Sequence, residues 1–238
     1  MAVIKTSPQD LKIINIRIKP KLVFHILLFA IFFLTFMNIL GLYLGSGVNP
    51  QYMVKFDFNQ EANIPAFFSA ISLFVCSMLL LSIALVGRKS KAETSSWFYL
   101  ALIFLFLSFD EAAGIHEMFI GMTRRTFNLS GYFYYAWIVP YGIAVVLLFA
   151  LLLPFLKKLR KRTRVLFLLS GTIFISGAIG FEMLGGNVIQ SQGPGALFSF
   201  FYTCEELLEM LGSSLFIYAL LDYITQTFGS NIRMVKDN

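Results

Sequence analysis

The stretch Ser108-Phe109-Asp110-Glu111-Ala112-Ala113-Gly114-Ile115-His116-Glu117 sets four ionisable side chains into an apolar run that is long enough to cross a membrane. Placing one ionisable side chain at membrane depth costs roughly 2.5 to 3.5 kcal/mol on insertion scales. Such residues are rare in membrane spans and mark functional sites where they occur. The stretch therefore predicts a membrane-spanning helix that carries part of a site.

The composition of the whole chain also indicates a membrane protein. Of the 238 residues, 58% are hydrophobic and 13% are charged, against about 25% charged in an ordinary soluble domain. A helix needs roughly 20 apolar residues to cross the ~30 Å hydrocarbon core of a bilayer. We predict an all-α, polytopic membrane protein with six transmembrane helices in one bundle, at about residues 22–44, 64–86, 95–119, 132–156, 165–187 and 197–224.

The positions of Lys and Arg predict the orientation of the bundle. The lead, the second and fourth connections and the tail carry five, three, six and two of them, which is 16 of the 19. Basic residues concentrate on the cytoplasmic side of a membrane, so we expect both termini there, in the cytoplasmic membrane of a bacterium. The predicted parts are a polar lead over 1–21, a transmembrane domain over 22–228 and a tail over 229–238. The net charge of +6 then reflects topology, and the expected partner is the lipid bilayer rather than nucleic acid.

Acidic residues gather on the opposite, extracytoplasmic side of the predicted bundle. Nine of the thirteen belong to that half, from one loop and three spans: Asp57, Glu61, Asp110, Glu111, Glu117, Glu182, Glu205, Glu206 and Glu209. Three helices therefore bring carboxylates to one level, beside His116.

Helical geometry limits which of these groups can cooperate. At 100° per residue, Asp110 and Glu117 share a face of the third span two turns apart, whereas Glu111 and His116 project to opposite flanks. The opening stretch should therefore supply only one wall of a site. In the sixth span the glutamates lie three or four residues apart, so that a pair of them can converge on one point.

Seven carboxylates inside the spans cannot all be ionised at close range in a low dielectric, so either a cation balances them or some hold protons. Carboxylate oxygens with at most one imidazole suit Mn, Fe, Ca or, less well, Zn. We predict a divalent metal ion bound by Glu111, His116, Glu182, Glu206 and Glu209. The predicted catalytic acid and base groups are Asp110, Glu111, His116 and Glu117.

Known metal motifs do not fit this pattern. A di-iron carboxylate helix has Glu three residues before its His, where this chain has Ala113. The HExxH zinc motif requires a second His at position 120, which is Ile120. Asp57, Asn59 and Glu61 alternate like the start of a calcium loop, but the Gly and the final Glu of an EF-hand are missing.

Two further features concern packing. Ser176 and Gly180 predict a small-residue face for close helix approach in the fifth span. The aromatic residues between 132 and 137 are typical of a membrane interface.

Four strings together resemble a group of uncharacterised bacterial multi-pass membrane proteins with an S-x-D-E…H-E signature. They are Glu61-Ala62-Asn63-Ile64-Pro65, the stretch from Phe106 to Glu117, Glu182 ahead of Gly185-Gly186, and Glu205-Glu206-Leu207-Leu208-Glu209-Met210-Leu211-Gly212. The resemblance covers about residues 52–220. It implies that these residues belong together, and it supplies no activity.

The favoured hypothesis is a membrane-embedded, metal-dependent enzyme whose site opens to the extracytoplasmic side and acts on a lipid or another amphiphile. A cation or proton transporter would use the same acids as a relay, although the cytoplasmic halves of the spans offer few polar residues to complete a path. A non-catalytic membrane assembly subunit is the third alternative. No oligomeric state is predicted.

Overall fold

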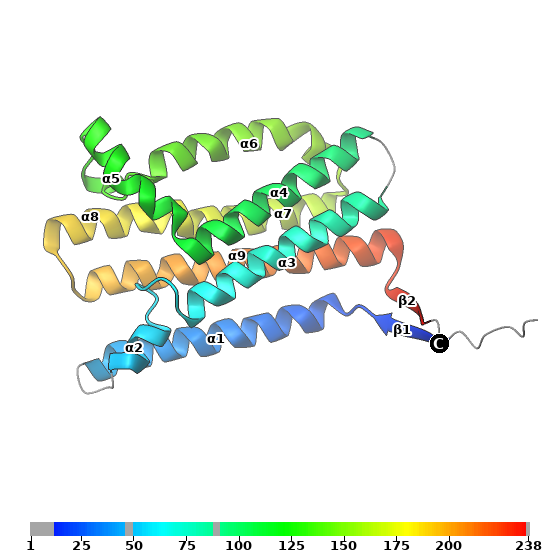
Figure 1. Ribbon diagram of the computed structural model, residues 1–238, viewed down its shortest axis with the longest axis horizontal. Coiled ribbons are helices and arrows are strands. Elements are labelled where there is room, and N and C mark those ends of the chain that lie inside the picture. Colours follow the sequence, from blue (N-terminus) through cyan, green and yellow to red (C-terminus); the bar gives the residue numbers. More distant parts are fainter. Residues whose placement is uncertain (1–11, 46–49, 88–90, 237–238) are drawn as a thin grey trace, which may run out of the picture.

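The computed structural model describes residues 12–45, 50–87 and 91–236. Helices dominate this part of the chain, and Figure 1 shows most of them running side by side. In chain order the elements are β1 (Lys12–Arg17), α1 (Pro20–Leu44), α2 (Pro50–Phe56), α3 (Ile64–Val86), α4 (Lys91–Ala113), α5 (Ile115–Phe127), η2 (Gly131–Phe133), α6 (Ile138–Lys158), α7 (Lys161–Ile175), η3 (Ser176–Phe181), α8 (Glu182–Gln192), α9 (Ala196–Phe228) and β2 (Asn231–Lys236).

Within the described residues, six helical segments are long and apolar enough to cross a membrane, which confirms the predicted all-α, six-span fold. They are Pro20–Leu44, Ile64–Val86, Thr94–Ala113, Ile138–Lys158, Lys161–Gln192 and Ala196–Phe228. Large apolar side chains such as Phe29, Val146 and Leu151 are exposed on the outside of the bundle. An exposed apolar surface of this extent is stable in lipid, not in water.

The start of α3 shows how local chemistry sets a boundary. Asn63 is the N-cap, and its side-chain oxygen accepts a hydrogen bond of 3.0 Å from the backbone N–H of Ala66. Pro65 lies in the first turn, where its missing N–H leaves no intrahelical bond unmade. The predicted span over 64–86 is confirmed to the residue.

The third span ends earlier than predicted. Gly114 adopts the left-handed backbone conformation with φ of 57°, which glycine tolerates because it lacks a Cβ. The chain turns there, so His116 and Glu117 belong to the separate helix α5 rather than to the last turns of the span. The predicted boundary at residue 119 and the helical-face relation between Asp110 and Glu117 are therefore wrong.

The fifth span is one continuous helical unit made of α7, η3 and α8, with a π-helical segment at η3. At Gly177 a Cβ would lie 2.6 Å from the backbone oxygen of Glu205, so only glycine permits this approach of η3 to α9. A Cβ at Gly180 would meet no atom within 4 Å. The prediction that Gly180 makes the close approach is wrong, because a π-turn holds an extra residue and rotates the face that follows it.

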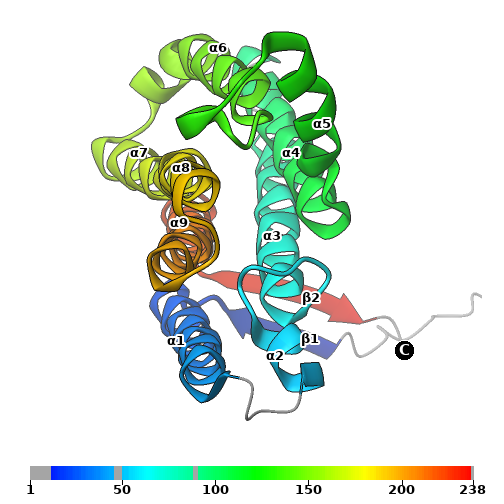
Figure 2. The same ribbon diagram turned by 90° about the vertical axis from the view of Figure 1, so that its left-hand side faces the viewer.

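Helix α9 is the centre of the bundle and contacts α1, α3, α7, η3 and α8. Helix α6 packs differently. Its buried residues are Ile138 at its start and Phe155 and Leu156 at its end, and none between these is buried. Figure 2, viewed along the helices, shows α6 set apart from α9.

The two ends of the described chain form an antiparallel ribbon at the same end of the bundle (Figure 1). β1 pairs with β2 from Lys12 opposite Lys236 to Arg17 opposite Asn231. The polar segments before the first span and after the last one therefore lie side by side, as an even number of spans requires.

Candidate functional site

The bundle contains a cavity of about 390 Å³ between α4, α6, the α7–η3–α8 unit and α9. Each of these helices lines it with residues three or four apart, which is the spacing of one helix face. On α9 the lining face includes Phe198, Tyr202, Glu205, Glu209 and Gly212. The volume is near the lower end of the range of about 300 to 1,000 Å³ for small-molecule sites.

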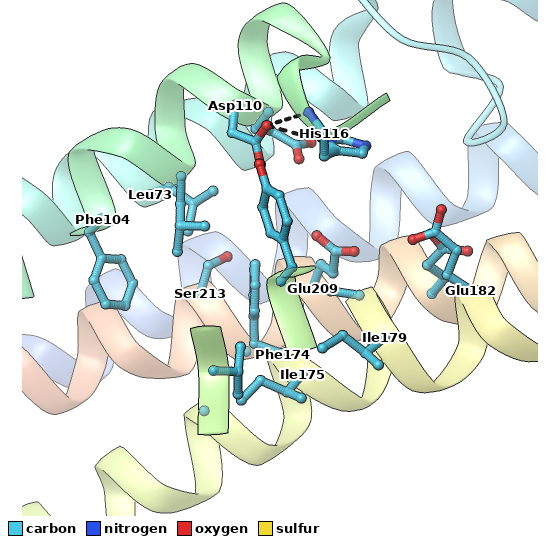
Figure 3. A pocket seen from close by; sticks show the side chains of 18 of the residues that line it. Leu73, Phe104, Asp110, His116, Phe174, Ile175, Ile179, Glu182, Glu209 and Ser213 are labelled. Atoms are coloured by element: carbon cyan, nitrogen blue, oxygen red, sulfur yellow. Dashed lines mark hydrogen bonds and ion pairs between the residues drawn. The ribbon is translucent and has the colours of Figure 1, made fainter. Parts of the chain in front are cut away.

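One end of the cavity, which we call the acidic end, collects every residue that the sequence predicts for the site. Its lining includes eight carboxylates and one imidazole: Glu61, Asp110, Glu111, His116, Glu117, Glu182, Glu205, Glu206 and Glu209. Figure 3 shows Asp110 and His116 on one wall, with Glu182 and Glu209 on other helices. The structure thus brings the predicted residues of α4, α5, α8 and α9 to one cavity.

Asp110 and His116 form a carboxylate–imidazole pair across the break at Gly114. Oδ1 of Asp110 lies 3.4 Å from Nδ1 of His116 and accepts a 2.7 Å hydrogen bond from the His116 backbone N–H. Asp110 is 5% exposed. Because the N-cap of α5 has no side-chain hydrogen bond of its own, this carboxylate also caps the first turn of α5. The turn at Gly114 makes both contacts possible.

Burial and nearby carboxylates act in opposite directions on His116. Burial lowers its pKa, but the hydrogen bond and charge of Asp110 and the charges of Glu182 and Glu61 outweigh this, so that its pKa lies above the ordinary value. For Glu61, burial and the charges of Glu117 and Asp110 raise the pKa, although His116 opposes the shift. The cavity therefore favours the protonated form of both groups.

The loop before α3 brings Glu61 to the cavity and is fastened from two sides. Asn38 of α1 is buried and accepts a 3.1 Å hydrogen bond from the backbone N–H of Phe58. Its Nδ2 donates to Oγ1 of Thr203 on α9 at 3.0 Å. Within the loop, Nδ2 of Asn63 donates to the Asp57 carbonyl oxygen at 2.7 Å. Of the alternating residues predicted from the sequence, Asn59 and Glu61 line the cavity.

Glu182 is held by the residue that precedes α6. The indole Nε1 of Trp137 donates a hydrogen bond of 2.9 Å to Oε1 of Glu182, and both side chains are buried. The Trp137 ring lies 5.0 Å from the rings of His116 and Tyr141. For Tyr135 nearby, burial and the charges of Glu182 and Glu205 raise the pKa of the phenol. An aromatic wall thus covers the acids.

The other end of the cavity, which we call the apolar end, runs between α4, α6, α7 and α9 toward the termini. Its lining is dominated by Leu100, Phe104, Leu152, Leu156, Phe167 and Phe216. Figure 3 shows Phe104 and Phe174 on this side of the acids. From Val145 to Leu156 the lining face of α6 covers 11 helical steps, or roughly 16 Å at a 1.5 Å rise per residue. The cavity is therefore polar at one end and apolar along the rest of its length.

Apart from His116, no basic side chain among the described residues of the lining balances the charges of the acidic end. Among the described residues that line the cavity, none is Lys or Arg. Arg124 is close by, but its guanidinium donates to the carbonyl oxygen of Tyr134 and lies 4.1 Å from the centre of the Tyr134 ring. The site therefore attracts cations and disfavours anions.

The arrangement of the donors bears on metal binding. Carboxylate oxygens with one imidazole are the chemistry that hard divalent ions prefer. Over the ranges that the structure describes, however, no three His, Cys, Asp or Glu side chains come together as ligands of one ion. The predicted ligands line the walls of one cavity without converging on a point.

Sequence reasoning missed several residues of the site, chiefly aromatic ones. Tyr135, Trp137, Tyr141 and Tyr202 line the cavity. Their signal was visible, since the aromatic residues from 132 to 137 fall at the level of the acids. The sequence pattern predicts that the aromatic residues from 132 to 137 lie at the membrane interface, and Tyr132 is exposed as such a residue should be. What distinguishes Trp137 is its contact with Glu182, 45 residues away.

A family model described as a domain of unknown function, DUF8692, matches residues 21–224. The chain belongs to the DUF8692 family. The match covers the six spans except for Pro20 and residues 225–228, and it includes all residues of the acidic end, so the site lies wholly inside the DUF8692 domain. No curated protein and no solved structure matches the chain.

Proposed function

We propose that this DUF8692 protein is a membrane-embedded enzyme that acts on a lipid or another amphiphile at the acidic end of the cavity. One observation carries the proposal: a single cavity joins eight carboxylates and an imidazole to an apolar channel within membrane-spanning helices. An amphiphile has the same two parts, a polar head and an apolar chain. A cation or proton transporter would instead need polar groups along the whole path, where the apolar end offers mainly Leu and Phe.

The Asp110–His116 pair suits general acid–base catalysis. A carboxylate beside Nδ1 fixes that nitrogen as the proton-bearing one, which leaves Nε2 to exchange a proton with the head group. The raised pKa of His116 increases its strength as a base. Glu111 and Glu117 are the proposed partners in proton transfer, since both line the acidic end.

A divalent metal ion, Mn, Fe, Ca or Zn, is part of the proposal. Its ligands would come from Glu111, His116, Glu182, Glu206 and Glu209. Such an ion, if bound, would supply Lewis-acid activation of water, and Nε2 of His116 would then be a ligand rather than a proton donor. In the described structure these side chains line the wall without converging on one point.

We also propose that both termini are cytoplasmic and that the acidic end faces the extracytoplasmic side of a bacterial cytoplasmic membrane. The excess of Lys and Arg at the end of the bundle that holds both termini supports this orientation. The test uses a chain whose own cysteines are removed by Cys76→Ala and Cys204→Ala, with a membrane-impermeant thiol reagent added to intact cells. A cysteine introduced by Asn128→Cys should react with the reagent, and one introduced by Lys158→Cys should not. The reverse pattern would refute the orientation.

The enzyme proposal is tested with purified protein in nanodiscs. The protein is incubated with a bacterial lipid extract, the products are followed by mass spectrometry, and bound metal is measured by elemental analysis. We expect conversion of one lipid class by the wild type, its loss in Glu209→Gln, and full activity in Asp222→Asn, a control acid that is paired with Arg162 away from the cavity.

Three results would overturn the enzyme proposal. Absence of any converted lipid and of stoichiometric metal would refute enzyme and metal together. Cation flux into proteoliposomes that Glu206→Gln abolishes would show a transporter instead. If the protein shows neither lipid conversion nor cation flux, and neutralising these acids abolishes the capture of a partner, the protein is an assembly subunit.

A further inference from the structure

The described structure shows an opening in the wall of the cavity on the lipid side. Four residues of α6 and α7 line the cavity and are also exposed: Phe149 of α6 at 49%, Leu168 and Ile175 of α7 at 40% and 37%, and Thr172 of α7. All but Thr172 are apolar. The opening therefore lies between α6 and α7 and leads into the hydrocarbon region of the bilayer.

The packing of α6 explains why this opening exists. At one end α6 continues directly into α7 through Leu159 and Arg160. At the other end the segment before α6 is tied to α8, because η2 contacts α8 and Gly131 donates its backbone N–H to the Gln190 side chain. Between Ile138 and Phe155, α6 has no buried residue. Helix α6 is thus buried only near its two ends.

We infer that the apolar end of the cavity holds one hydrocarbon chain of a membrane amphiphile, which enters sideways between α6 and α7 while its head group lies at the acidic end. The inference rests on the proposed function and specifies its substrate class. The lining face of α6 over the apolar end is roughly 16 Å long, close to one leaflet of a ~30 Å hydrocarbon core. The cavity volume of about 390 Å³ suits one chain rather than two. The excess of carboxylates favours a head group that carries an ammonium group.

The two tryptophans of the chain report on the two ends of the cavity. Trp137 lines the acidic end. Trp97 is buried, and its ring lies 5.9 Å from the ring of Phe167 at the floor of the apolar end. Bromine quenches tryptophan fluorescence at short range, so brominated chains locate an amphiphile along the cavity.

The test uses lysophosphatidylethanolamine with bromine either at the far end of its chain or next to its head group, added to protein in phosphatidylcholine nanodiscs. Far-end bromine should quench Trp97 in Trp137→Phe, and head-side bromine should quench Trp137 in Trp97→Phe. The wild type, measured in parallel, shows whether either substitution itself abolishes binding.

Two glycines offer a matched pair of variants. Gly171 lines the apolar end, and a Cβ there would meet no atom within 4 Å, so Gly171→Leu fills the cavity without a backbone clash. Gly142 of α6 is equally unobstructed, but it is not part of the lining. Quenching of Trp97 should be lost in Gly171→Leu and kept in Gly142→Leu.

The outcomes separate this inference from the function on which it rests. Two results would overturn the inference and leave amphiphile binding intact. One is quenching of Trp137 without quenching of Trp97, and the other is equal quenching of Trp97 in the two glycine variants. Absence of quenching by both probes in all chains, the wild type included, would refute the binding of an amphiphile and with it the proposed function.

Discussion

Trp137 donates its indole N–H to Oε1 of Glu182 at 2.9 Å, and this bond joins the start of α6 to the fifth span inside the cavity wall. Leaving a buried polar group without its hydrogen-bond partner costs about 1 to 3 kcal/mol. We expect Trp137→Phe to lower the free energy of unfolding by about this amount, because an aromatic ring remains while the buried Glu182 side chain loses its donor. Denaturant unfolding in detergent micelles measures the change.

A double-mutant cycle isolates the contact between Trp137 and Glu182. Glu182→Leu removes the acceptor of this bond and Trp137→Phe removes its donor, so each single variant breaks the contact. The combined variant should be more stable than the sum of the two single effects predicts. Additive effects would show that the bond contributes nothing to stability.

Asn38 should be essential for placing Glu61, although it lies on α1, outside the cavity. Asn38→Leu keeps a similar volume but leaves the Phe58 N–H without its acceptor and Thr203 without its donor. An unsatisfied buried group costs about 1 to 3 kcal/mol, so we expect destabilisation of that order and faster proteolysis of the loop before α3.

Thr35, one turn away, has a buried hydroxyl without a hydrogen-bond partner among the described residues. Thr35→Val is therefore the control and should be neutral or stabilising; equal loss in both variants would contradict the role of Asn38.

The approach of η3 to α9 predicts that alanine substitutions at two glycines of the fifth span change the stability of the protein in opposite directions. Gly177→Ala places a methyl group 2.6 Å from the Glu205 backbone oxygen, and overpacking of this kind typically costs about 1 to 3 kcal/mol. Gly171→Ala meets open space and should stabilise by up to about 1 kcal/mol, since alanine is the better helix former. Thermal unfolding of the two variants beside the wild type tests this. Equal stability would mean that α9 does not approach the span at Gly177.

The sequence predicts the spans well because an apolar run of about 20 residues has few alternatives to crossing the membrane. It also predicts which acids meet, since alternating span directions bring Glu182 and Glu206 to the level of Asp110. It does not predict the turn at Gly114, because a glycine within a helix costs only about 1 kcal/mol and need not end it. Nor does it predict the π-turn at η3 or the bond between Trp137 and Glu182, which depend on packing between distant segments. The fold thus follows from local hydrophobicity, whereas the inner face of the site follows from tertiary contacts.

His116 provides the pH dependence of the site. The chain has two histidines, so His25→Gln leaves one imidazole signal for an NMR titration in chelator. We expect the pKa of His116 to lie above the ordinary value of about 6.5 and to fall in Asp110→Asn, whose side-chain oxygen still caps α5 while its charge is gone. Asp222→Asn should leave it unchanged.

The same shift predicts how stability depends on pH. A pKa raised on folding stabilises the folded state fully below about pH 6.5, the unfolded value, and this contribution is lost as pH rises through the folded value. The measurement compares the thermal midpoint of His25→Gln with that of a chain that carries both His25→Gln and Asp110→Asn. The difference between the two midpoints should be larger below pH 6.5 than at alkaline pH. If the difference does not depend on pH, or if the pKa of His116 is at or below 6.5, burial outweighs the attraction of Asp110. The pair would then lack the basicity that the proposed chemistry needs.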